Sequence, residues 1–139
     1  MRSKKVFTIL SAVLVIGAIA SLVQAKRPRK IPNGNWGGQH IQLSVANGSA
    51  TIEYDCANGK IDGPLRLNSR GRFDLRGTHV REHGGPVRSD EDTTGAPARY
   101  TGWTNGKTMK LTVTLVNTNT VIGTFELTRG NEGRVFKCR

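Results

Sequence analysis

The chain has 139 residues, a formal net charge of +11, two cysteines and three histidines. This length fits one domain, and two isolated cysteines lack the paired spacing of zinc motifs. The sequence contains no G-x-S-x-G nucleophile motif and no other catalytic signature. We therefore expect no enzyme, no cofactor and no metal site.

The first 25 residues are predicted to be a secretory signal peptide. Arg2, Lys4 and Lys5 precede an apolar run at residues 6–23, and Ala25 ends the segment at a cleavage site. The alternative is an uncleaved membrane anchor, because an apolar run of that length can just span a bilayer. Cleavage near Ala25 predicts a secreted or periplasmic protein.

A basic arm is predicted at residues 26–33, ahead of a single domain at residues 34–139. Its charges belong to Lys26, Arg27, Arg29 and Lys30. Blocks of like charge are commonly disordered, so we expect a flexible tail. The alternative is a contact with an anionic surface, such as lipid head groups, wall polymers or nucleic acid.

The domain alternates between apolar and polar side chains in short runs, as half-buried antiparallel strands do. Asn-Gly pairs at residues 47–48, 58–59 and 105–106 predict tight hairpin turns. We expect eight strands, at residues 40–45, 50–56, 61–67, 72–80, 97–104, 109–115, 121–128 and 134–138. The predicted fold is all-β: an eight-stranded antiparallel up-and-down meander that forms a closed or nearly closed small barrel.

One disulfide, between Cys56 and Cys138, is expected in an exported chain with two cysteines. It would close about 80 residues of chain, for which the chain-entropy model gives about 4 to 5 kcal/mol of stabilisation. The two cysteines are predicted to meet at one rim of the barrel.

Residues 81–96 have no apolar period and are rich in glycine and charge. Long connections of this kind are usually functional or disordered, and loops carry binding residues more often than scaffolds do. We interpret this loop as a functional rim; a disordered insertion is the alternative. The candidate binding residues here are His79, Arg81, His83 and Arg88.

The spacing of Tyr100 and Trp103 places them on opposite faces of one strand. If Tyr100 faces the core, Trp103 lies outside beside Arg99, where it is a candidate contact for a partner or a carbohydrate. The alternative is a bulge at Gly102 that returns Trp103 to the core. Arg99, Tyr100 and Trp103 complete the candidate binding residues.

Gly34-Asn35-Trp36 resembles the G-x-W motif of lipocalins and their barrel relatives. The resemblance implies that Trp36 closes the bottom of the barrel and that Arg134 or Lys137 packs over its ring in a cation–π contact. It also implies a secreted binding protein. A second resemblance, carried by residues 54–59 and Cys138, is to small periplasmic lysozyme inhibitors, which are disulfide-linked β-barrels.

We therefore expect a monomeric, secreted or periplasmic, non-catalytic β-barrel protein that binds a small ligand, a carbohydrate or a protein. Three alternatives are an inhibitor of a lysozyme or protease, an envelope-associated structural protein held by the basic arm, and a hydrolase that uses His79 and His83.

Overall fold

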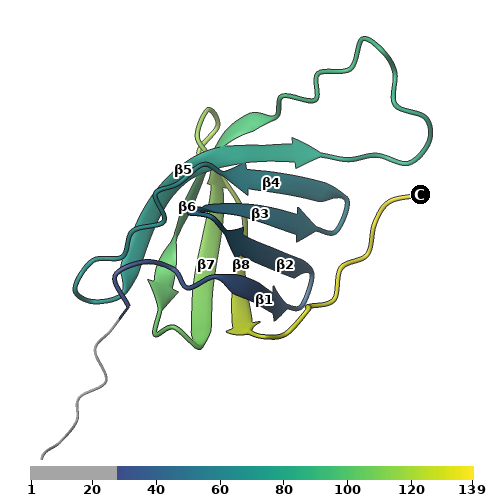
Figure 1. Ribbon diagram of the computed structural model, residues 1–139. Coiled ribbons are helices and arrows are strands. Elements are labelled where there is room, and N and C mark those ends of the chain that lie inside the picture. The colour runs from purple at the N-terminus through teal and green to yellow at the C-terminus, as the bar shows by residue number, and fades with distance from the viewer. Residues whose placement is uncertain (1–27) are drawn as a thin grey trace, which may run out of the picture.

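The computed structural model describes residues 28–139, in which all regular elements are β-strands. The predicted signal peptide, Lys26 and Arg27 lie outside the described residues. The strands are β1 (Gly34–Gly38), β2 (Ile41–Ala46), β3 (Ser49–Tyr54), β4 (Ala57–Ile61), β5 (Arg72–Arg81), β6 (Ala96–Thr104), β7 (Thr108–Leu115) and β8 (Thr120–Arg129) (Figure 1). This part of the chain contains no helix long and apolar enough to cross a membrane.

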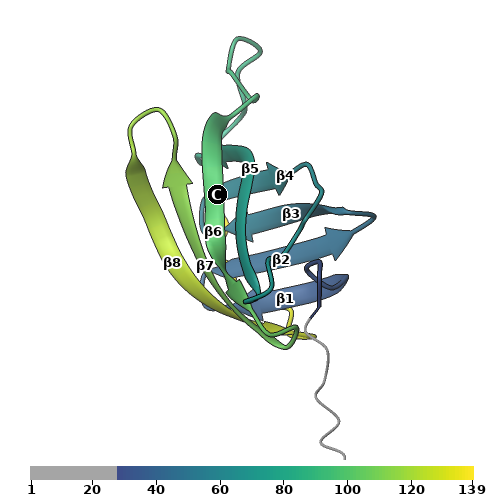
Figure 2. The same ribbon diagram turned by 90° about the vertical axis from the view of Figure 1, so that its left-hand side faces the viewer.

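Each strand pairs antiparallel with the next, and β1 pairs with β8 to close the barrel. The closing seam is short, with Trp36 opposite Arg129 and Gly37 opposite Thr128. Away from this seam, β7 and β8 splay from β1 to β4 toward the long loop (Figure 2). The prediction of an all-β, eight-stranded antiparallel barrel is confirmed.

The barrel has two unlike ends. At the closed end, Trp36 has no exposed surface and its indole nitrogen donates to the Pro32 carbonyl oxygen at 3.1 Å. At the open end, the loop of residues 82–95 projects from between β5 and β6. The core lies between them and contains the inward-facing residues of all eight strands, among them Ile41, Leu43, Ile52, Tyr100, Leu111, Val113 and Leu127.

The strands predicted at residues 97–104, 109–115 and 121–128 are confirmed as β6, β7 and β8. Its first turn contains Asn105, whose side-chain oxygen accepts from the backbone nitrogens of Lys107 and Thr108, both at 2.8 Å. Gly106 has φ +92°, which glycine adopts without strain. The Asn-Gly pair therefore forms the tight turn that its sequence predicts.

The prediction of a hairpin turn at residues 58–59 is wrong. Asn58 and Gly59 lie inside β4, opposite Glu53 and Ile52. The turn comes earlier, at Asp55 and Cys56, where Cys56 has φ +51°. Gly59 is a glycine because a Cβ atom there would collide with the Tyr100 hydroxyl group, so it marks a close approach within a strand.

The first and last strands also differ from the prediction. Residues 134–138 do not form a strand; only Arg134 makes an isolated parallel bridge, with Gln39. Residues 34–38, which were not predicted to form a strand, are β1 and complete the set of eight. Glycines occupy three of these five positions, so the segment shows no alternation of apolar and polar side chains. A Cβ atom at Gly37 would collide with the backbone of Gly133, and one at Gly38 with the backbone of Glu126.

The predicted strand at residues 61–67 is likewise wrong. After Ile61 the chain leaves the sheet and crosses the closed end as a loop that continues to Arg72. Leu65 is still buried, at 2% exposure, and its carbonyl oxygen accepts from the Ile31 nitrogen at 3.0 Å. The apolar alternation here reflects a loop packed on the core.

Candidate ligand-binding site

A cavity of about 1010 Å³ lies at the open end of the barrel. Its walls come from β3 to β8, and the base of the long loop contributes Glu82, Asp92 and Gly95. The lining combines apolar and aromatic side chains, such as Tyr54, Leu115 and Phe125, with charged ones at the rim, such as Arg81 and Asp92. The splayed strands of Figure 2 open the barrel at this end.

Three rings meet in this cavity. The Tyr54 ring lies 5.4 Å from the His79 ring and 5.8 Å from the Phe125 ring, in tilted geometry. Aromatic pairs at such distances and angles attract each other beyond simple burial. Tyr54 on β3, His79 on β5 and Phe125 on β8 thus connect three walls of the cavity.

The polar atoms of this cluster are only partly satisfied. The Tyr54 hydroxyl is buried and has no hydrogen-bond partner among the described residues. Burial raises the pKa of Tyr54, and the neighbouring Tyr100 phenol adds to that effect. Burial lowers the pKa of His79, and Arg81 lowers it further, so the imidazole is neutral at neutral pH. The cluster is uncharged there.

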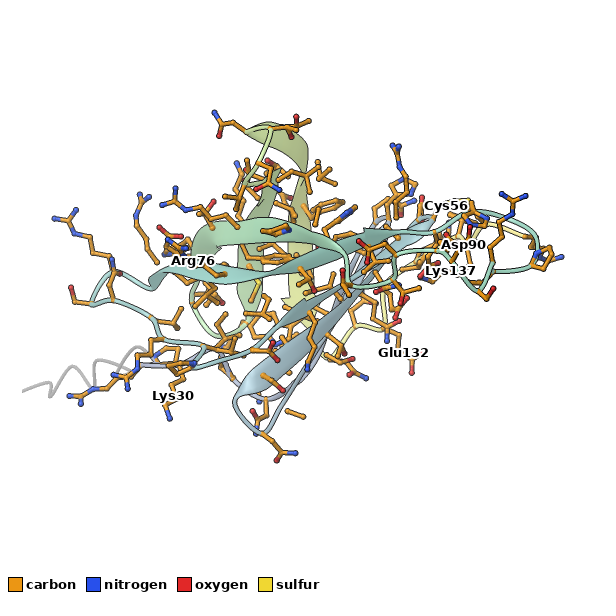
Figure 3. All side chains as sticks on the ribbon, turned by 90° about the horizontal axis from the view of Figure 1, so that it is seen from above. Lys30, Cys56, Arg76, Asp90, Glu132 and Lys137 are labelled. Atoms are coloured by element: carbon orange, nitrogen blue, oxygen red, sulfur yellow. A yellow bond between two sulfur atoms is a disulfide. The ribbon has the colours of Figure 1, made fainter. Side chains whose placement is uncertain are left out.

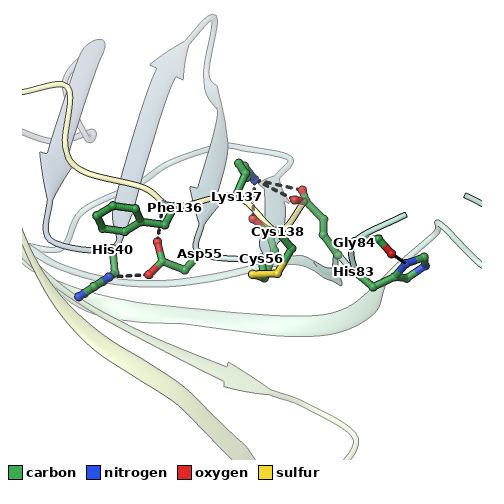
Figure 4. Close-up of a disulfide and its surroundings, with 10 residues drawn as sticks. His40, Asp55, Cys56, His83, Gly84, Phe136, Lys137 and Cys138 are labelled. Carbon is green, nitrogen blue, oxygen red and sulfur yellow. Dashed lines mark hydrogen bonds and ion pairs between the residues drawn. A yellow bond between two sulfur atoms is a disulfide. The ribbon is translucent and has the colours of Figure 1, made fainter. Parts of the chain in front are cut away.

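The C-terminal tail fixes one side of the open end. Cys138 is bonded to Cys56 with their Cα atoms 4.9 Å apart, which confirms the predicted disulfide (Figure 4). The Phe136 nitrogen donates to an Asp55 carboxylate oxygen at 2.7 Å. Cys138 lies in the C-terminal tail and not in a strand of the sheet. The fixed separation of about 4.8 Å between neighbouring strands therefore does not set the distance between Cys56 and Cys138.

Ion pairs add to this attachment. Lys137 donates to Glu82 at 3.1 Å and to the Ala57 carbonyl oxygen at 3.0 Å, and it pairs with Glu53. The Asn58 side chain also donates to Glu82, at 2.7 Å. The hydrogen bond from Asn58 is the main cause that lowers the pKa of Glu82, followed by Lys137. The first residue of the long loop is therefore anchored to both β4 and the tail.

The candidate residues of the long loop are divided by the structure. His79 and Arg81 line the cavity. His83 does not; its ring bonds Glu91 at 2.6 Å and the Gly84 carbonyl oxygen at 3.0 Å, within the loop. Arg88 is exposed in the same loop. No group of three or more His, Cys, Asp or Glu side chains placed to hold a metal occurs within residues 28–139.

The candidates on β6 also separate. Tyr100 has no exposed surface and donates to the Thr78 carbonyl oxygen at 2.7 Å, whereas Trp103 is 39% exposed on the outer face. The opposite faces predicted from their spacing are confirmed, and Gly102 introduces no bulge. Arg99 is exposed and forms an ion pair with Asp74.

The pair expected to close the barrel is only half present. Trp36 is buried at the closed end, but Arg134 lies on the tail, where its backbone bonds Gly38 and His40. The basic residue opposite Trp36 in the last strand is Arg129, which donates to the Asn33 carbonyl oxygen at 2.7 Å. Arg129 could be predicted as the partner of Trp36 only if residues 34–38 were first identified as a strand that pairs with β8.

Comparison with known proteins gives no match to a family model, to a curated protein or to a solved structure.

Proposed function

We propose that this chain is an exported, non-catalytic binding protein that takes a small, largely apolar ligand into the open end of its barrel. The observation that carries the proposal is the cavity of about 1010 Å³ around Tyr54, His79 and Phe125. Ligand sites are typically concave, largely apolar and supplied with a few polar groups, in pockets of about 300–1,000 Å³.

The polar atoms favour a ligand with one hydrogen-bonding group. The Tyr54 hydroxyl has no accessible surface, so the polar group that a ligand meets in the ring cluster belongs to His79. The neutral imidazole of His79 adds a donor or acceptor in the same cavity. A ligand with an apolar body and a single uncharged polar group therefore suits this part of the cavity.

Export is supported by the disulfide together with the predicted signal peptide. A bond between cysteines 82 positions apart persists in oxidising compartments, such as the periplasm or the extracellular space. The resemblance to lipocalins is likewise a hypothesis. It is supported by the burial of Trp36 at the closed end of a barrel whose other end is open.

A hydrolase that uses both His79 and His83 has less support. His83 is bonded to Glu91 within the loop, and only His79 lines the cavity. General acid–base catalysis by the pair needs both groups within reach of one substrate. The arrangement thus favours binding over catalysis.

The test uses N-phenyl-1-naphthylamine, an apolar fluorophore without charge, titrated into the purified protein. We expect saturable fluorescence enhancement that falls at least about tenfold in affinity in Ala96→Trp, because Ala96 lines the cavity and an indole there fills it. Thr51→Trp is the matched control, since Thr51 is exposed on the outer face of β3. Equal affinity in both variants would contradict the proposal.

A further inference from the structure

A second surface lies on the outer face of the barrel near its closed end. Register places Arg72 of β5 and Lys110 of β7 on either side of Trp103 in β6. All three side chains are exposed, and they form one row across three strands. Neighbouring strands are about 4.8 Å apart, so each cation stands within side-chain reach of the indole.

Two hollows meet at this row. One, of about 900 Å³, lies toward β5 and is lined by Arg66, Asn68, Arg72, Trp103 and Lys110 among others. The other, of about 980 Å³, lies toward β8 and includes Trp103, Lys110, Thr128 and Arg134. Because Trp103 and Lys110 line both, an extended ligand can cross the surface from one hollow to the other.

Positive charge gathers on the β5 side of the row. Arg66, Arg72 and Lys110 make no ion pair within the described part of the chain. Backbone contacts bring the basic arm to the same place: the Leu67 nitrogen donates to the Arg29 carbonyl oxygen at 2.9 Å, and Lys30 bridges Arg66. Figure 3 shows Lys30 on the side of the molecule away from Cys56 and Asp90.

The nearby acids do not cancel this charge. Asp74 is held by Arg99, which lowers the pKa of its carboxyl group through a hydrogen bond. Glu126 follows Lys110 in the same row, so the β8 side is mixed in charge. An anionic ligand is therefore attracted mainly by the hollow on the β5 side.

The indole itself is presented for contact. Its nitrogen makes no hydrogen bond among the described residues, and Gly71 beside it has no side chain to cover that edge. The next row up the sheet holds the hydroxyl groups of Thr101, Thr112 and Thr124, of which the last two are bonded at 2.9 Å. An aromatic face beside cations and hydroxyl groups offers stacking, charge and hydrogen bonds together.

We propose that this surface binds an anionic polysaccharide, with a sugar ring stacked on Trp103 and its carboxylate or sulfate groups paired with Arg72, Lys110 and Arg66. Single-stranded nucleic acid is less well suited, because such sites stack successive bases on several aromatic side chains. Within residues 28–139 the other exposed large aromatic residue is Phe136, on the tail at the open end. This binding is separate from the cavity.

The test follows Trp103 fluorescence in the purified protein. Acrylamide quenches exposed indoles, and the chain has only two tryptophans, of which Trp36 is fully buried. Polygalacturonate, which carries one carboxylate per ring, should protect Trp103 from quenching in a salt-sensitive manner. Neutral dextran should give no protection, and oligo(dT) tests the nucleic-acid alternative.

Variants then assign the binding to this row. Affinity for polygalacturonate, measured by calorimetry, should fall at least about tenfold in Trp103→Ala and in the double variant Arg72→Gln, Lys110→Gln. The control, Arg88→Gln with Arg139→Gln, removes the same charge from exposed positions elsewhere and should change affinity less than about twofold. Equal loss in the control, no binding, or tighter binding of oligo(dT) would each overturn the proposal.

Discussion

Gly59 of β4 leaves the space that the hydroxyl group of Tyr100 occupies in β6, two strands away. A Cβ atom at position 59 would collide with that hydroxyl oxygen and would lie 2.8 Å from the Thr78 carbonyl oxygen, which accepts the Tyr100 hydrogen bond. The contact joins β4, β5 and β6. A Cβ atom at position 59 would also lie 3.5 Å from the ring of Tyr54, which lines the cavity, so this packing borders the binding site.

Gly59→Ala should destabilise the fold by about 1–3 kcal/mol, the usual cost of inserting a methyl group into a packed interior. Chemical denaturation measures the change. In a Tyr100→Phe background the same substitution should cost less, because the hydroxyl group is absent. Additive losses in the double variant would show that the two positions do not interact.

Reduction of the disulfide should lower the free energy of unfolding by about 4 to 5 kcal/mol in the chain-entropy model. Cys138→Ser should have a similar effect, because the bridge joins residues 82 positions apart. Denaturation with and without reductant provides the measurement. Two reactive thiols in the native, unreduced protein would contradict the bridge.

Asp55 should contribute to stability in a pH-dependent way. The Phe136 backbone hydrogen bond is the largest cause that lowers its pKa, with His40 and Lys137 adding to it. The folded-state pKa lies below the unfolded value, so this stabilisation is complete above about pH 4 and is lost as the pH falls through the folded pKa. Melting temperatures of the wild type and Asp55→Asn should therefore converge as the pH falls below the ordinary aspartate value of about 4.

Asp62→Asn is the control for that profile, since the Asp62 side chain is exposed and forms an ion pair with Lys60. Its acid profile should parallel the wild type. A constant difference in melting temperature between Asp55→Asn and the wild type across the range would refute the role of the Asp55 carboxylate.

Replacing residues 83–94 with a short Gly-Ser link should leave the melting temperature within a few degrees of wild type. Glu82, which holds the loop base to Asn58 and Lys137, remains in this variant. The replacement removes the part of the cavity wall that the loop contributes at Asp92, so less of the bound N-phenyl-1-naphthylamine is shielded from water and its binding should weaken. Unchanged affinity would exclude the loop from the site.

Sequence patterns predicted the barrel where side-chain alternation is strong. The faces of β6 and β7, the Asn105 turn and the disulfide all follow from local residue chemistry. The predictions failed at positions where a glycine allows two segments of the backbone, or a side chain and the backbone, to pack closely. Gly37 and Gly38 allow the tail and β8 to approach β1, and their lack of side chains left no apolar alternation from which β1 could be predicted. Gly59 makes room for Tyr100, although the Asn58-Gly59 pair had been interpreted as a turn.

The candidate site was predictable only in part, because a cavity is a relationship between strands distant in sequence. His79 and Arg81 were predicted through their place at the start of the long loop, while nothing in the sequence distinguishes Tyr54 and Phe125 from other residues of their predicted strands. Their convergence depends on the barrel closing at the Trp36–Arg129 seam and splaying at the other end. Arg72 and Lys110 flank Trp103 through cross-strand register, which local sequence does not encode.

Nuclear magnetic resonance of the purified protein titrated with N-phenyl-1-naphthylamine tests the central claim most directly. Ligand entry at the open end predicts saturable shifts of the Tyr54, His79 and Phe125 ring resonances. It also predicts an unmoved Trp103 indole N–H, because Trp103 lies outside the cavity at the other end of the barrel. Shifts centred on Trp103, or none at the three rings under saturation, would contradict the account.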